Sequence, residues 1–154
     1  PDQIRAVDFV GFLDDSLGSE KPIDGDLCGR EYYYNTFHLH ANLPDIVPTN
    51  LDADGLCAIA HINNLEYVEY IVNTDTAGVY TFELNYARGF SGSVTVDIVV
   101  DSVAMATFTV SSTGGWYSYT TSSISLGSLS VGDHNIKLDF NAGVNYRWFK
   151  LELV

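Results

Sequence analysis

The sequence predicts an all-β protein, built as an antiparallel β-sandwich or barrel. Apolar and polar residues alternate with a period of two along much of the chain. Glycine, asparagine, aspartate and serine separate these stretches at short intervals, and apolar residues rarely follow helical spacing. About ten short strands with no helix between them are typical of antiparallel sandwiches and barrels.

The clearest strand is expected over residues 78–88, which read GVYTFELNYAR. Tyr80, Phe82, Leu84 and Tyr86 alternate with polar residues there. Successive side chains of a strand point to opposite faces, so one face of this segment should pack in a core. Two β-branched segments, 93–100 and 103–110, flank Asp101-Ser102. That arrangement predicts a hairpin with a tight turn.

The remaining strands are expected on the same grounds, at these positions: 4–12, 57–62, 66–72, 124–129, 134–140 and 146–153. Residues 13–56 differ, because they hold most of the prolines and many aspartates and asparagines. We expect long loops there with one or two short strands, one of them around Thr36–His40. Loops held on a rigid β scaffold often carry binding residues.

Length and charge limit the function. The 154 residues suit a single domain spanning 1–154. The formal net charge is −13, which disfavours nucleic acid, an anionic membrane surface and a heavily sulfated or carboxylated ligand. No apolar run approaches the roughly 20 residues needed to span a bilayer. An uncharged ligand is therefore favoured.

The chain opens at Pro1 without a methionine or a basic-then-apolar leader, which predicts a mature or excised domain. Low lysine with abundant serine, threonine, glycine and tyrosine is common in secreted β proteins. We therefore expect a secreted, extracellular and monomeric protein. Its two cysteines, Cys28 and Cys57, match no zinc pattern. They form either a disulfide or a pair of buried thiols.

Several motifs in order carry a family resemblance. The opening IRAVDFVGFLDD, the run from Asp45 to Val72, and GVYTFELNYARG are followed by TGGWYSYTT, LSVGDHNIKLDF and NYRWFKLEL. Together they resemble the family 6 carbohydrate-binding modules over most of the chain. The resemblance implies a β-sandwich jelly roll with adjacent terminal strands. It also implies non-catalytic recognition of a neutral polysaccharide or oligosaccharide, and a covalently attached glycoside hydrolase catalytic domain.

The sequence also departs from that family. Residues 28–44 look like an insertion or a rebuilt loop. The family's first strand carries a glutamate pair for a structural calcium ion, where this chain has Arg5 and Val7. The family has tryptophan or tyrosine where His61 stands.

Trp116 is the leading candidate for ligand binding. It follows two glycines in a polar stretch, and an exposed indole can bury about 150–250 Å² against a flat apolar surface. The resemblance makes it one wall of a sugar-stacking cleft; the alternative is a tryptophan covering the core rim. The opposite wall would be His61, Tyr67 or one of the tyrosines at 32–34. His61 is also interpretable as a polar residue at a strand end.

Two polar residues complete the expected site. By resemblance, Asn145 hydrogen-bonds sugar hydroxyls, which an amide suits because it both donates and accepts. A turn asparagine is the alternative. Glu66 falls where family members often carry an acid near the ligand; a solvated acid at the strand edge is the alternative. Trp148 is interpreted as a core residue.

A structural calcium ion is the cofactor considered, because clustered carboxylates bind hard cations. The acids expected to serve are Asp8, Asp14, Asp15 and Asp139, with Asp24 and Asp26 as alternatives. His38 and His40 lack an obvious third metal ligand. No serine-hydrolase, zinc-protease or phosphate-loop motif occurs in the sequence, so we expect no catalysis.

The expected function is therefore recognition of a neutral glycan of the β-glucan, xylan or agarose type. The alternative is a structural or protein-interaction β-sandwich that has lost the sugar site. His61 and the rebuilt 28–44 loop motivate that alternative.

Overall fold

The computed structural model describes residues 3–6, 10–13, 45–48, 57–60, 62 and 64–154. Their strands form two antiparallel sheets, and no α-helix occurs among them. The expected all-β sandwich is confirmed. Within the same residues no helix has the length and apolar character that crossing a membrane requires.

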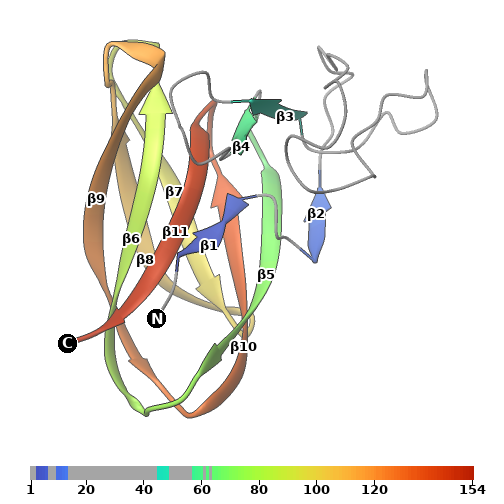
Figure 1. Ribbon diagram of the computed structural model, residues 1–154, viewed down its shortest axis with the longest axis vertical. Helices are drawn as coiled ribbons and strands as arrows, with labels where there is room; N and C mark the ends of the chain where they lie inside the picture. The colour runs from blue at the N-terminus through green and yellow to red at the C-terminus, as the bar shows by residue number, and fades with distance from the viewer. Residues whose placement is uncertain (1–2, 7–9, 14–44, 49–56, 61, 63) are drawn as a thin grey trace.

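The first sheet contains β3 (Asp45–Pro48), β4 (Cys57–Ala60), β11 (Asn145–Leu153), β6 (Gly78–Arg88) and β9 (Gly115–Leu129), in that order. β1 (Ile4–Arg5) also pairs with β11, as Figure 1 shows with β1 in blue and β11 in red. The first and last strands of the chain are therefore neighbours, as the resemblance implied.

The second sheet contains β2 (Gly11–Leu13), β5 (Glu66–Thr74), β10 (Gly132–Phe140), β7 (Ser93–Val100) and β8 (Val103–Ser111), in that order. The two sheets face each other along the length of the molecule (Figure 1). One prediction was wrong here. Residues 4–12 do not form one strand, because β1 joins the first sheet and β2 joins the second.

The core forms where the inner faces of the sheets meet. Tyr80, Phe82, Leu84 and Tyr86 of β6 are all buried, so the alternation in 78–88 is confirmed. The Phe149 ring stacks on Phe82, with ring centroids 5.4 Å apart. The edge contact between Phe149 and Tyr70 brings those centroids to 4.8 Å, so aromatic rings from both sheets fix the spacing of the layers.

The predicted hairpin between 93–100 and 103–110 is confirmed as β7 and β8. Asp101 and Ser102 have φ values of 49° and 70°, as the tightest hairpin turns require. Trp148 is buried, as expected, but its place differs. It pairs with Asn85 on the outer side of the first sheet and is not part of the inter-sheet cluster.

Three predictions fall on residues that the structure leaves undescribed. The strand around Thr36–His40, the rebuilt 28–44 loop and a bridge involving Cys28 all lie outside the described residues.

Candidate functional site

A large bulge in β9 positions Trp116. From Thr81, which opposes Ser125, β6 and β9 pair regularly until Tyr86 opposes Thr120, and the next pair is Arg88 with Gly115. Residues 116–119 of β9 therefore stand opposite Ala87 alone. A bulge releases residues from the ladder and redirects their side chains. The sequence predicted a strand only from residue 124, so this bulged half of β9 was missed.

The indole of Trp116 is seated against a glycine. A Cβ built on Gly89 would stand 2.5 Å from Nε1, 2.6 Å from Cδ1 and 2.8 Å from Cε2 of that ring. Near-equal distances to three adjoining ring atoms place that point above the ring plane, since a point off the edge would be nearest to one atom by a wide margin. One face of the indole thus rests on the Gly89 backbone.

A second glycine, Gly143, lies near the six-membered ring of the same indole. A Cβ on Gly143 would stand 3.5 Å from Cη2 of Trp116 and 3.3 Å from the Ile62 carbonyl oxygen. Trp116 is half-buried and is not part of the core cluster. The role of Trp116 as a wall of a sugar-stacking cleft stays a prediction, and so does the alternative of a tryptophan covering the core rim.

Asn145 lies beside Trp116. Its side-chain Nδ2 donates a hydrogen bond to the Trp116 carbonyl oxygen over 2.9 Å, and the residue is buried. An amide carries two N–H hydrogens and one acceptor oxygen, so this bond uses only part of its capacity. The structure brings together these two predicted site residues.

Phe90 and Arg88 also surround Trp116, and the sequence analysis missed both. The Phe90 and Trp116 ring centroids lie 5.1 Å apart, with the planes at 83°. Arg88 is buried and donates from Nη1 to the Gly143 carbonyl oxygen over 2.6 Å. The signal available in the sequence was the Gly89-Phe90 pair directly after the alternating strand. A glycine there lets a neighbouring ring approach the backbone closely.

A series of contacts between polar side chains runs from this end along the outer side of the first sheet. The Arg147 guanidinium carbon lies 4.4 Å from the centre of the Tyr119 ring. Its Nε donates to the Asn85 side-chain oxygen over 2.6 Å, and Asn85 in turn donates to the Thr121 hydroxyl over 2.9 Å. Desolvation lowers the pKa of Arg147. The bulge places Tyr119 there, and its position could not be read from alternation alone.

Two other predicted ligand residues, Glu66 and Tyr67, belong to β5 of the second sheet. Tyr67 is on the outer face of the second sheet, where Lys137 Nζ lies 5.0 Å from its ring centre. Glu66 begins β5 and is buried opposite Phe140, so it is not a solvated strand-edge acid. His61 lies outside the described residues, next to Ile62 in the chain.

The described residues do not assemble a calcium site. Asp139 Oδ2 lies 2.9 Å from the Lys137 ammonium, so that carboxylate already has a cationic partner. No group of three potential metal-ligating side chains occurs in the part of the chain that the structure describes. Asp8, Asp14 and Asp15 lie outside it, and calcium binding by those residues stays a prediction.

Comparison with known proteins shows the family to which this chain belongs. Residues 42–153 match the carbohydrate-binding module family 6. The chain therefore belongs to that family, whose members are non-catalytic binding modules.

The individual relatives agree with this assignment. The β-agarase AgaA of Microbulbifer thermotolerans is 28% identical over 152 residues, which cover 92% of this chain and 32% of that protein. The chain thus spans about a third of that relative's length.

Two solved structures share the fold. The family 6 module of the Cellvibrio mixtus lichenase 5A, solved with cellotriose, has a TM-score of 0.71 at 20% identity and covers 99% of this chain and 97% of its own. A β-1,3-glucan-binding family 6 module from Bacillus halodurans has a TM-score of 0.70 at 17% identity and covers 98% and 95%. The β-sandwich jelly roll is thereby established.

Proposed function

We propose that this chain binds a neutral polysaccharide by stacking a sugar ring on the face of Trp116 that points away from Gly89. The supporting observation is the seat of the indole at the end of the sandwich. Gly89 supports one face and fixes the ring plane. A pyranose offers C–H groups on its faces, so it can cover the other side of an aromatic ring without losing its hydroxyl hydrogen bonds.

Asn145 supplies the polar contact in this proposal. Its bond to the Trp116 carbonyl oxygen holds the amide against the Trp116 backbone, and its remaining hydrogen-bonding capacity suits sugar hydroxyls. The net charge of −13 favours uncharged glycans over acidic ones. The relatives, which include a β-agarase and modules that bind β-glucans, indicate agarose and β-glucans as the first ligands to test.

The biological role follows from the family. A binding module holds its attached catalytic domain close to an insoluble or dilute polysaccharide, which raises the effective substrate concentration. We accordingly propose a secreted, monomeric module that serves a covalently attached glycoside hydrolase and has no catalytic activity of its own.

Affinity electrophoresis tests the proposal. The wild-type chain is run in gels containing laminarin, lichenan, xylan or low-melting agarose, beside Trp116→Ala. Retardation of the wild type in at least one gel, abolished in the variant, is expected. No retardation in any gel would favour the alternative of a structural or protein-interaction sandwich. Release of reducing sugar from the same polysaccharides would contradict the absence of catalysis.

A further inference from the structure

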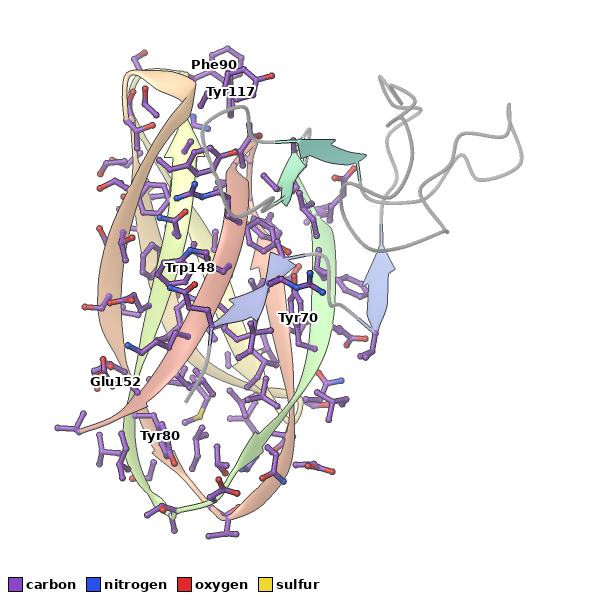
Figure 2. The ribbon with its side chains drawn as sticks, in the orientation of Figure 1. Tyr70, Tyr80, Phe90, Tyr117, Trp148 and Glu152 are labelled. Atoms are coloured by element: carbon purple, nitrogen blue, oxygen red, sulfur yellow. The ribbon has the colours of Figure 1, made fainter. Side chains whose placement is uncertain are left out.

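Phe90 is a large apolar residue at the exposed end of the sandwich. It is 64% exposed, and Figure 2 shows it at that end of the sandwich. One exposed phenylalanine alone indicates nothing. This one contacts Trp116, because the two ring centroids are 5.1 Å apart, and it therefore adjoins the proposed sugar platform.

Arg88 lies beside the Phe90 ring. Its guanidinium carbon lies 5.8 Å from the ring centre. The same guanidinium is buried and bonded to the Gly143 carbonyl oxygen. The Arg88 backbone is tied to Thr113 in both directions, with N to Oγ1 at 2.9 Å and the Thr113 N to the Arg88 oxygen at 3.0 Å.

The angle between the rings restricts what can bind. The planes of Phe90 and Trp116 meet at 83°. With Phe90 standing beside the open face of the indole, a sugar lying flat on that face would present its edge to Phe90. The edge of an ordinary hexopyranose carries hydroxyl groups, and placing them against an apolar ring removes water without a replacement hydrogen bond. A 3,6-anhydro sugar replaces two hydroxyls by an internal ether. Its bicyclic ring therefore presents C–H groups on a second side.

We infer that Phe90 is a specificity-determining residue that favours glycans containing 3,6-anhydro sugar units over glycans of plain hexopyranoses. This inference rests on the proposed function, because it needs the sugar to stack on Trp116. It assigns the two perpendicular rings different tasks. Trp116 provides affinity by contacting the face of any pyranose. Phe90 distinguishes sugars by the groups that they carry on their edge.

Isothermal titration with two oligosaccharides tests the inference. Neoagarohexaose supplies the 3,6-anhydro unit, and cellohexaose supplies plain glucose units. Phe90→Ala should weaken binding of neoagarohexaose roughly 3- to 10-fold, the size of one aromatic contact, and should change cellohexaose binding less than about twofold. Phe90→Tyr keeps the ring and should retain the preference. Val131→Ala, which alters an exposed residue beyond the other end of β9, should change neither affinity.

The affinity losses for the two oligosaccharides, compared with each other, separate this role of Phe90 from a structural one. An equal loss of affinity for both oligosaccharides in Phe90→Ala, or no loss for either, would overturn the inference and leave the proposed function intact. A wild type that binds cellohexaose and not neoagarohexaose would do the same. A wild type that binds no glycan at all would instead contradict the proposed function.

Discussion

Both ring nitrogens of His134 face acceptors, and the nearer one is a carboxylate oxygen of Asp101. Nδ1 lies 2.7 Å from Asp101 Oδ2, and Nε2 lies 2.9 Å from the Ser130 carbonyl oxygen. A carbonyl and an ionised carboxylate only accept hydrogen bonds, so the doubly protonated ring satisfies both contacts. In its protonated form His134 therefore joins the β7–β8 turn to the β9–β10 turn.

This geometry predicts a pH-dependent stability. The Ser130 carbonyl, followed by Asp101 and more weakly by Asp133, raises the pKa of His134 above its ordinary 6.5. The bond to His134 and the Asn135 backbone N–H lower the pKa of Asp101 below 3.8. The His134 contribution is complete below pH 6.5 and is lost as pH rises through its raised pKa. The Asp101 contribution is complete above pH 3.8 and is lost as pH falls through its lowered pKa.

Urea denaturation from pH 4 to 9 measures this effect. His134→Gln should cost about 1 kcal/mol near pH 5.5, a value kept small because the Asp101 carboxylate is half exposed. The difference between wild type and variant should shrink at pH 9. Asp101→Asn should flatten the same pH dependence. A difference that stays constant from pH 5 to 9 would contradict the imidazolium assignment.

Gly89→Ala should displace the Trp116 indole. The added Cβ would meet three ring atoms within 2.8 Å, and such overpacking costs about 1–3 kcal/mol. Glycan binding should fall with it. The same substitution in a Trp116→Ala background is the control, since the indole is then absent. If the cost of Gly89→Ala is unchanged there, the glycine acts through its backbone and does not seat the ring.

Phe149→Ala should strongly destabilise the fold. Its ring is fully buried between Phe82 and Tyr70, and deletion of a core phenylalanine costs about 3–5 kcal/mol. Phe90→Ala removes the same atoms from the exposed end and should cost less than about 1 kcal/mol. Urea denaturation of both variants gives the comparison. Similar losses would mean that the Phe90 contacts support the core.

Calcium binding by Asp8, Asp14 and Asp15 predicts a chelator effect. EDTA should lower the melting temperature, and added calcium should restore it, because an ion bound only by the folded state stabilises that state. Asp139→Asn should leave this response unaltered, since Asp139 is paired with Lys137. A melting temperature that does not respond to EDTA would contradict a structural calcium ion.

Alternation predicted most of the sheet strands, because side chains on the two faces of a half-buried strand differ in polarity. It succeeded best in β6, whose core-facing tyrosines and phenylalanine are confirmed. It failed at residues 4–12, where the chain leaves one sheet and joins the other. The sequence of a short apolar run does not indicate which sheet each half of the run joins.

The site was predicted less completely. Trp116 and Asn145 came from a spaced family pattern, and the structure brings them into contact. Arg88, Gly89 and Phe90 were missed because their importance depends on the register between β6 and β9. The four residues that stand opposite Ala87 set that register, and their side chains follow no period of two.

Tyr86 pairs with Thr120 on one side of that bulge, and on the other side Arg88 pairs with Gly115, where β6 ends and β9 begins. The segment between those pairs contributes no pair to the ladder between β6 and β9. Insertions or deletions at 116–119 could alter ligand preference during evolution, or in a selection experiment, while the sandwich tolerates them.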